Sequence, residues 1–336
     1  MTGLPRGLGS RAAQPEEADI FTLAHISDLH ATPVAPAGLR PLLSKRALGW
    51  VSWRARRSAI HRTEVLDALL EDLDETAPDQ IVITGDLTNV SLEEEFAAAR
   101  EWLRRIGDPG RVTAIPGNHD AYVRVSRERS WDLWAEYLVS DAAGRALLAG
   151  DPASDPTAIH FPSVRIRKPV AIVGISSAVP TAPFYASGSV GAVQLERVER
   201  VLTELAATDL FRVVLIHHPP DPLATSARRG LRDAGALCDV LRRTGAELVL
   251  HGHLHRAHRG WLEGPGAPIP VLGAASASDV GVRPHKCANY HLFGVEALGR
   301  GGRARFRLTL RARTWDAGAA RFVADGCEVE LAPSAA

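Results

Sequence analysis

Histidine and aspartate residues gather in five short clusters that lie far apart in the sequence. The clusters are Asp28-Leu29-His30, Gly85-Asp86, Gly117-Asn118-His119-Asp120, His217-His218 and His251-Gly252-His253-Leu254-His255. Their imidazoles, carboxylates and amide oxygen form a mixed nitrogen and oxygen ligand set without thiolates, which suits Mn, Fe or Zn better than calcium. The set is larger than one tetrahedral ion needs. Two divalent ions sharing one carboxylate would use all of it, and such pairs catalyse in-line displacement at phosphorus.

Each cluster directly follows a short apolar run that is typical of a buried strand. The runs cover residues 20–26, 81–84, 112–115, 213–216 and 247–250. The ligand crevice of an open α/β sheet lies at the carboxyl ends of its strands, so we expect the five clusters to converge there. Asp28 and His30 are two residues apart, as are His253 and His255, and each pair would project to one side of an extended backbone. The glycines that permit tight turns and close approach to an ion are Gly85, Gly117 and Gly252.

Amphipathic patterns between these runs predict helices over residues 65–73, 91–103, 193–205 and 231–241. The second of these helices begins with a capping box formed by Ser91 and Glu94. Strands and helices thus alternate, which favours an α/β layered core. Short strands are expected at 271–274, 290–295, 306–313 and 322–331, with a hairpin loop at 299–302, and we expect them to form a second sheet packed on the first.

Length and composition indicate an ordinary globular protein. The 336 residues include 39 Lys+Arg and 39 Asp+Glu, and a formal net charge of zero argues against nucleic acid as a partner. The three cysteines form no CxxC pair, which argues against a disulfide framework or a thiolate zinc site and fits a reducing compartment. The N-terminus lacks the apolar run of a signal peptide, so we expect a cytoplasmic protein. We expect a flexible segment at residues 1–18 and a single domain over residues 19–331.

The ordered set DxH, GD, GNHD, HH and HGHxH resembles the calcineurin-like metallophosphoesterase superfamily over residues 20 to about 295. The HHPP sequence at 217–220, the IPGNHD sequence around Asn118 and the segment 188–195 resemble its class III cyclic-nucleotide phosphodiesterase branch. The resemblance implies an α/β fold in the form of a four-layer α/β/β/α sandwich of two packed mixed sheets. The metal site would lie at the carboxyl ends of the strands.

The same resemblance implies a role for each residue of the clusters. One ion would be held by Asp28, His30, Asp86 and His255, and the other by Asp86, Asn118, His217 and His253. Asp86 would bridge the two ions, which would be Mn, Fe or Zn. His119 would face the scissile phosphate, stabilising the transition state or protonating the leaving oxygen, and Asp120 would fix the orientation of His119. A water between the ions would become the hydroxide nucleophile near neutral pH.

Other polar residues near the clusters have simpler interpretations. The histidines expected to be structural or to support the ligands are His25, His218, His251 and His258. Arg124, Arg256 and Arg283 either bind phosphate oxygens or are solvated surface residues.

A basic segment rich in tryptophan, here called the insert, occupies residues 31–62 between the first two clusters. It contains no acidic residue, and its basic residues are Arg40, Lys45, Arg46, Arg54, Arg56, Arg57 and Arg62. The apolar residues between them are Leu42, Leu43, Leu48, Trp50, Val51 and Trp53. One interpretation is a cap helix whose tryptophans pack on the body of the protein. The others are contact of residues 40–62 with an anionic membrane surface or lipid, and contact with nucleic acid.

These observations predict a metal-dependent phosphoester hydrolase that acts on a small phosphorylated molecule, most simply a cyclic-nucleotide-like phosphodiester. One alternative is a lipid pyrophosphatase resembling the UDP-diacylglucosamine diphosphatases, which would place the protein at the inner face of the membrane. A nuclease is a further alternative, and a non-enzymatic binding module that keeps the fold is the last. The metal motifs do not distinguish among the three enzymes, because fold and metal set do not decide the substrate.

Overall fold

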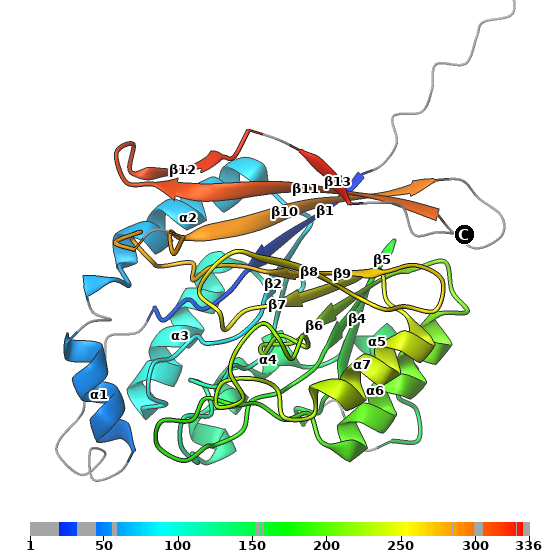
Figure 1. The fold of residues 1–336 in the computed structure, drawn as a ribbon, viewed down its shortest axis with the longest axis horizontal. Helices are drawn as coiled ribbons and strands as arrows, with labels where there is room; N and C mark the ends of the chain where they lie inside the picture. Colours follow the sequence, from blue (N-terminus) through cyan, green and yellow to red (C-terminus); the bar gives the residue numbers. More distant parts are fainter. Residues whose placement is uncertain are drawn as a thin grey trace, which may run out of the picture.

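Two mixed β-sheets pack face to face, with helices on both outer sides, in the computed structural model of the chain (Figure 1). The structure describes residues 20–31, 45–55, 59–151, 155, 158–283, 285–298, 305–326 and 328–331. The segment at 1–18 and the hairpin loop expected at 299–302 lie outside these residues.

The first sheet joins strands from opposite ends of the sequence. Its strands are β1 (Ile20–Ile26), β2 (Gln80–Ile83), β3 (Val112–Ala114), β10 (Asn289–Leu298), β11 (Arg305–Asp316), β12 (Arg321–Ala324) and β13 (Val329–Leu331). Their order is β12-β11-β10-β1-β2-β3, and β13 pairs with β11. β1, β2 and β3 run parallel, whereas β10 is antiparallel to β1, with Ile20 opposite Glu296.

The second sheet is built from the middle of the chain. Its strands are β4 (Ser163–Arg167), β5 (Val170–Gly174), β6 (Phe211–Leu215), β7 (Leu248–His251), β8 (His258–Leu262) and β9 (Ile269–Gly273). They lie in the order β4-β5-β6-β7-β9-β8, and the four central strands are parallel. The carboxyl ends of β5, β6, β7 and β9 therefore lie at one edge of this sheet.

The helices cover the outer faces of the two sheets (Figure 1). Their bounds are α1 (Arg46–Ala55), α2 (Thr63–Thr76), α3 (Glu93–Ile106), α4 (Ala135–Leu138), α5 (Ala142–Ala146), α6 (Ala192–Leu205) and α7 (Ala234–Thr244). Two 3₁₀ turns occupy Arg127–Arg129 and Trp131–Trp134. α2 and α3 lie against the first sheet, and α6 and α7 against the second.

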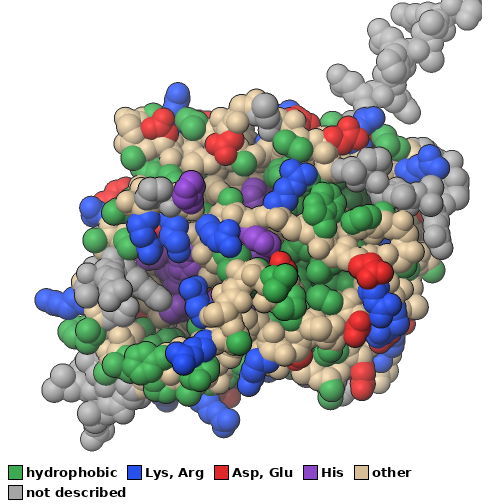
Figure 2. All heavy atoms as spheres, viewed as in Figure 1, with side chains coloured by type: hydrophobic (Ala, Val, Ile, Leu, Met, Phe, Trp, Pro, Cys, Tyr) green, Lys and Arg blue, Asp and Glu red, His purple; other side chains and the backbone are tan. Residues whose placement is uncertain are grey.

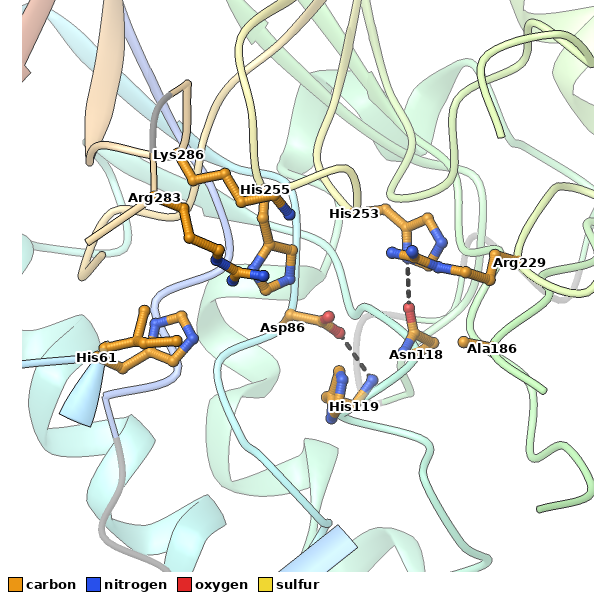
Figure 3. Close-up of a pocket in the computed structure, with 11 residues that line it drawn as sticks. His61, Asp86, Asn118, His119, Ala186, Arg229, His253, His255, Arg283 and Lys286 are labelled. Atoms are coloured by element: carbon orange, nitrogen blue, oxygen red, sulfur yellow. Dashed lines mark hydrogen bonds between the residues drawn. The ribbon is translucent and has the colours of Figure 1, made fainter. Parts of the chain in front are cut away.

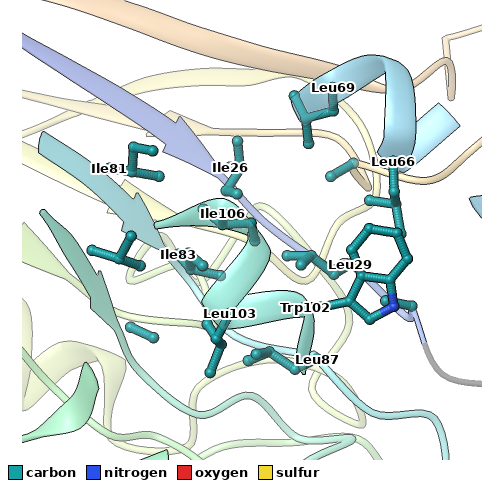
Figure 4. Close-up of a cluster of buried hydrophobic side chains, with 14 of the residues drawn as sticks. Ile26, Leu29, Leu66, Leu69, Ile81, Ile83, Leu87, Trp102, Leu103 and Ile106 are labelled. Carbon is teal, nitrogen blue, oxygen red and sulfur yellow. The ribbon is translucent and has the colours of Figure 1, made fainter. Parts of the chain in front are cut away.

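Alternation along the strands produces three layers of buried apolar side chains, because successive residues of a strand point to opposite faces. Ile81 and Ile83 of β2 pack with Leu66 and Leu103 of the helices on the first sheet (Figure 4). Val82, between them in sequence, faces the second sheet in the central layer. The third layer lies under α6 and α7. The four-layer α/β/β/α sandwich is therefore confirmed.

The expected composition of the two sheets is wrong in one respect. The C-terminal strands do not form the second sheet. β10 to β13 extend the sheet of β1, β2 and β3, whereas β9 lies in the sheet of β6 and β7 and pairs with β7 and β8. The run 322–331 is divided into two short strands that pair with different parts of β11. Which strands pair depends on contacts between distant parts of the chain, and local patterns do not encode them.

The start of α3 also differs from the expected capping box of Ser91 and Glu94. The helix begins at Glu93, and the buried carboxylate of Glu95 accepts hydrogen bonds from the backbone N–H groups of Asn89, Val90 and Leu92 at 2.7, 3.0 and 3.0 Å. Ser91 has a positive φ of 59°, and its hydroxyl donates to the carbonyl of His119 at 2.7 Å. The serine hydroxyl is thus used by the loop that carries His119 rather than by the helix.

Among the helices of the described residues, none combines the length and the apolar character needed to cross a bilayer.

Candidate metal centre

The strand ends of both sheets bring the five clusters to one place, as the sequence predicts. Figure 3 shows residues of three of them, Asp86, Asn118 with His119, and His253 with His255. Asp28 and His30 follow β1, Asp86 follows β2, and Asn118 and His119 follow β3. From the second sheet, His217 follows β6, and His253 and His255 follow β7. Because each sheet supplies part of the set, the site lies across the join between the sheets rather than on one of them.

The first group of candidate ligands consists of Asp28, His30, Asp86 and His255, and one donor atom from each lies within 4.8 Å of the other three. Nε2 of His255 is 3.2 Å from Oδ1 of Asp28 and 3.4 Å from Nε2 of His30. Two carboxylates and two imidazoles at this spacing could surround one divalent ion.

A second group adjoins the first through Asp86. Nε2 of His217 lies 3.3 Å from Oδ2 of Asp86 and 3.0 Å from Oδ1 of Asn118. Nδ1 of His253 lies 2.8 Å from the same amide oxygen. Asp86 therefore contacts both groups, which is the position of a carboxylate shared between two ions.

Each aspartate has one oxygen held by hydrogen bonds and one that accepts none from the described residues. Oδ2 of Asp28 accepts from the hydroxyl of Ser27 at 2.6 Å and from the N–H of His253 at 3.0 Å, and Oδ1 of Asp86 accepts from the N–H of His119 at 2.7 Å. Oδ1 of Asp28 and Oδ2 of Asp86 are buried without a hydrogen-bond partner among those residues. Buried carboxylate oxygens are costly unless they are paired, so these two fit a bound cation.

Backbone carbonyls fix the orientation of two of the imidazoles. Nδ1 of His30 donates to the carbonyl of Thr88 at 3.0 Å, and Nδ1 of His217 donates to the carbonyl of Thr84 at 2.6 Å. A carbonyl only accepts, so Nδ1 of each ring carries a proton and Nε2 is the nitrogen left to coordinate a metal.

The protonation states of the two aspartates and of His253 suit metal binding. Burial raises the pKa of Asp28, but His255, His217 and His30 outweigh burial and hold that pKa well below its ordinary value. The pKa of Asp86 is lowered for the same reason, mainly by His217. Burial, with His218 and His217, lowers the pKa of His253 well below its ordinary value. The carboxylates are therefore ionised and His253 is neutral, which are the states that bind a metal. Burial lowers the pKa of His217, but the carboxylate of Asp86 outweighs burial and raises that pKa to about 9, so His217 must release a proton to coordinate a metal.

The backbone around the ligands takes uncommon conformations. Asp28, His30, Asp86, His253 and His255 all have positive φ, between 42° and 69°. For residues other than glycine this region costs free energy, and it occurs mainly where the surrounding structure enforces it at functional sites.

Two of the predicted glycines leave room for the carboxylates. A Cβ atom at Gly252 would lie 2.0 Å from Oγ of Ser27 and 2.6 Å from Oδ2 of Asp28. At Gly117 it would lie 2.2 Å from Oδ1 of Asp86. The close approach of the backbone expected at Gly117 and Gly252 is thus confirmed, and the neighbours are the carboxylates of Asp86 and Asp28.

His119 lies beside the metal ligands, and the carbonyl of Asn89, rather than Asp120, contacts its ring nitrogen. Its Nδ1 donates a short hydrogen bond to the carbonyl of Asn89, and its ring stacks on Tyr122 at 5.7 Å between centroids. The carboxylate of Asp120 accepts instead from the N–H groups of Gly117 and Thr88, at 2.9 and 2.8 Å. Asp120 thus ties the GNHD loop to the loop after Asp86, and the ring of His119 is held by the carbonyl of Asn89. An orienting role of Asp120 stays a prediction.

His218, His25, His251 and His258 lie around the centre rather than in it. Nε2 of His218 donates to the carbonyl of Ala186 at 3.0 Å, so its Nδ1 accepts from the hydroxyl of Ser177 at 2.8 Å. Burial lowers the pKa of His218 to about 3. This histidine is a neutral, fully bonded neighbour of His253, as expected from the sequence.

A pocket of about 390 Å³ opens over the two groups, and three of its cationic or imidazole residues are not among the candidate residues named from the sequence. They are His61, Arg229 and Lys286, which lie in loops outside the five motifs. A single histidine in the otherwise basic insert was the one available signal for His61. Arg283 also lines the pocket, whereas Arg124 and Arg256 are not among its lining residues.

The described part of the insert contains helix α1, which packs on the body in agreement with the cap interpretation. Trp50 and Trp53 of α1 lie against the buried side chains of Val90 and Leu92. Nζ of Lys45, just before α1, donates to the carbonyl of Thr181 at 3.1 Å. Both tryptophans are thus engaged by the protein itself, so they give no support to the membrane or lipid interpretation.

A family model described as calcineurin-like phosphoesterase matches residues 21–257. A probable cyclic nucleotide phosphodiesterase of Synechococcus sp. (strain WH7803) is 36% identical over 93 residues, which cover 27% of this chain and 35% of that protein. A cAMP/cGMP dual specificity phosphodiesterase of Mycobacterium tuberculosis is 27% identical over 274 residues, 79% of this chain and 70% of that protein. The chain thus spans about a third of the first relative and more than two thirds of the second.

Among solved structures, a dimetal phosphatase from Danio rerio is 12% identical, with a TM-score of 0.47, and the match covers 93% of this chain and 98% of that one.

Proposed function

The chain belongs to the calcineurin-like phosphoesterase family, and we propose that it is a metal-dependent phosphodiesterase that hydrolyses a small phosphodiester of the cyclic-nucleotide type. The observation that carries this proposal is the pair of buried oxygens, Oδ1 of Asp28 and Oδ2 of Asp86, which accept no hydrogen bond from the described residues and are faced by imidazole nitrogens. The names of the two relatives support the substrate class.

We assign two divalent ions to the two groups of donors. Asp28, His30, Asp86 and His255 would hold one ion, and Asp86, Asn118, His217 and His253 the other. The absence of thiolates from both groups favours Mn, Fe or Zn. When bound, the ions supply positive charge to the phosphate oxygens and lower the pKa of the attacking water.

His119 is assigned to proton transfer. It lines the pocket over the two groups of donors, and Nδ1 donates to the carbonyl of Asn89, which makes Nε2 the nitrogen that exchanges a proton with the leaving oxygen. The hydrogen bond to Asn89 keeps a proton on Nδ1, so Nε2 is the nitrogen that takes up a second proton and delivers it to the leaving oxygen. Asp120 acts on the chemistry through the position of the GNHD loop.

A substrate comparison with Mn-reconstituted protein tests the proposal. We expect turnover of bis-p-nitrophenyl phosphate and cyclic AMP, slower turnover of p-nitrophenyl phosphate, and none after treatment with a chelator. Cleavage confined to a UDP-linked lipid would instead favour the pyrophosphatase alternative, and cleavage of single-stranded DNA alone would favour the nuclease. A protein that binds both ions but cleaves no ester would contradict an enzymatic role.

We also propose that residues 19–331 form one domain, which the pairing of β1 with both β2 and β10 supports. A cytoplasmic location stays a prediction.

A further inference from the structure

Three cations line the pocket of the metal centre from two sides (Figure 3). Arg283 and Lys286 lie in the loop between β9 and β10, on the side of His255, and Arg229 lies in the loop between β6 and α7, on the side of His253. The space-filling view shows the histidines in a hollow with Lys and Arg side chains around it (Figure 2).

These three cations have no ion pair with any carboxylate of the described residues. Some other surface arginines do have one: Arg243 contacts Glu199 at 2.8 Å, and Arg105 contacts Asp67 at 2.6 Å. Burial and the neighbouring Arg283 and Arg229 lower the pKa of Lys286, and the carboxylate of Asp279 opposes them. Like charges gathered at one pocket favour an anionic ligand between them.

A simple phosphodiester has no further anionic group to pair with these three cations. Its single negative charge belongs to the phosphate that two metal ions would bind, and the charge of the three cations then exceeds that of Asp279, the carboxylate that acts on Arg283 and Lys286. Arginine and lysine at the wall of a pocket are typical of phosphate recognition, and the planar arginine fork can bind two phosphate oxygens at once.

We propose that the substrate carries a second phosphate group, which Arg283 and Lys286 bind while the metal centre holds the scissile phosphodiester, with Arg229 neutralising charge on the opposite wall. This inference rests on the proposed function and narrows it to diesters that bear a further phosphate. Arg283 and Lys286 are suited to act together because the N–H of Lys286 donates to the carbonyl of Arg283 at 3.1 Å, which places both on one turn.

A matched pair of probes tests the proposal: the p-nitrophenyl ester of thymidine 5′-phosphate, and the same ester carrying an additional 3′-phosphate. In both, water attacks the 5′ phosphorus, the bond to the p-nitrophenyl oxygen breaks, and p-nitrophenol is released, so only the second phosphate differs. We expect kcat/KM with Mn-loaded protein to be about tenfold or more higher for the doubly phosphorylated probe, mainly through KM, as for a charge-assisted hydrogen bond.

Variants of the cationic wall complete the test. Arg283→Gln and Lys286→Gln should each bring the ratio of the two kcat/KM values closer to one, and the double variant should abolish the preference. Arg259→Gln is the matched control, because Arg259 lies on β8 outside the pocket and stacks on Trp261 at 5.8 Å. Equal kcat/KM for the two probes in the unsubstituted protein would overturn the proposal, as would a preference that survives in the double variant.

Calorimetry separates this inference from the proposed function. Thymidine 3′,5′-bisphosphate should bind the metal-loaded protein about tenfold more tightly than thymidine 5′-phosphate, and the double variant should lose the difference. This result would support the cationic wall even if no ester were cleaved, in which case only the proposed function fails. Equal affinities would overturn the inference while leaving the hydrolysis of bis-p-nitrophenyl phosphate to decide the function.

A second inference concerns His61, which independent contacts place beside the first group of ligands. One nitrogen each of His30, His61 and His255 lies within 4.8 Å of the others, and the rings of His61 and His30 are 4.8 Å apart. Nδ1 of His61 is 2.8 Å from Oγ of Ser278 and 3.3 Å from Oγ of Ser276. Ser276 donates its hydroxyl proton to the carbonyl of Asp28 at 2.6 Å, so it accepts from Nδ1 of His61, and Nε2 is the nitrogen that would coordinate a metal.

We infer that His61 is an additional protein ligand of the ion assigned to Asp28, His30, Asp86 and His255, supplied by the insert. His61→Ala should weaken binding of one of two Mn ions about tenfold or more in a chelator competition and leave the other unchanged, with an unaltered melting temperature of the metal-free protein. In a Co-substituted protein the visible absorption of one site should change. His160→Ala, outside the pocket, serves as the control. Unchanged metal affinity and an unchanged Co spectrum would overturn this assignment.

Discussion

The backbone N–H of His119 donates a 2.7 Å hydrogen bond to Oδ1 of Asp86. The residue assigned to proton transfer therefore also orients the carboxylate assigned to both ions, and it does so with its main chain rather than its ring. Replacing the side chain of His119 leaves this hydrogen bond in place, so the two contributions can be separated by mutation.

Asp86→Asn should weaken both ions, because the oxygen that accepts no hydrogen bond from the described residues is the atom common to the two groups. We expect the affinity for each of two Mn ions to fall by more than about tenfold in equilibrium dialysis with metal analysis. Asp28→Asn is the matched control and should weaken only one ion. Retention of one ion at full affinity in Asp86→Asn would show that this carboxylate is not shared.

His119→Ala should keep both ions and lose turnover. We expect kcat for bis-p-nitrophenyl phosphate to fall by about 10²- to 10⁴-fold, the usual contribution of a positioned general acid. Metal content measured on the same sample provides the control, because the N–H that holds Asp86 remains. Loss of metal in parallel with activity would assign His119 a structural role instead.

Gly252→Ala should damage the centre through its carboxylate. The new methyl group would lie 2.0 Å from Oγ of Ser27 and 2.6 Å from Oδ2 of Asp28, so the strand end must shift, at a cost of about 1–3 kcal/mol in the free energy of unfolding. Gly235→Ala is the control: no atom lies within 4 Å of the added methyl, and the position is inside α7, where alanine is favoured by up to about 1 kcal/mol. Urea unfolding of both variants gives the comparison, and similar stability for the two would contradict the packing argument.

His291 should make stability fall as the pH falls from neutral. Burial lowers the pKa of His291 to about 4, whereas an unfolded histidine has a pKa of about 6.5. Between these values the unfolded chain binds a proton that the folded chain does not, so the contribution is complete above about pH 6.5 and is lost on the way to pH 4. The slope from this one group is up to about 1.4 kcal/mol per pH unit. The slope of unfolding free energy between pH 6 and 5 should be smaller by about this amount in His291→Gln than in the unsubstituted protein, and equal slopes would contradict the prediction.

The sequence predicts the convergence of the clusters well, and the reason is local. Asp28, Asp86 and His217 each follow an apolar run directly, and parallel strands bring their carboxyl ends to one edge whatever the order of the strands. The first turn of a helix is harder to predict from sequence. The hydroxyl of Ser91 could cap α3 or bind the carbonyl of His119, and only the folded chain selects the second partner.

Sequence patterns do not predict which cations line the wall of the pocket. Arg229 and Lys286 lie in loops that share no spacing with the metal motifs, and what distinguishes them is their position at the wall of the pocket. Sequence alone contains many similar arginines. Asp120 gives the opposite case, because its place in the motif is evident but its hydrogen bonds to Gly117 and Thr88 depend on how two loops meet.

The position of β1 between β2 and β10 has a consequence for how the protein folds during synthesis. β1 is made well before its antiparallel neighbour β10, because Ile20 pairs with Glu296. Such pairings between distant segments carry a high loop-closure cost and form slowly. The strand that positions Asp28, two residues beyond its end, therefore gains its antiparallel neighbour late.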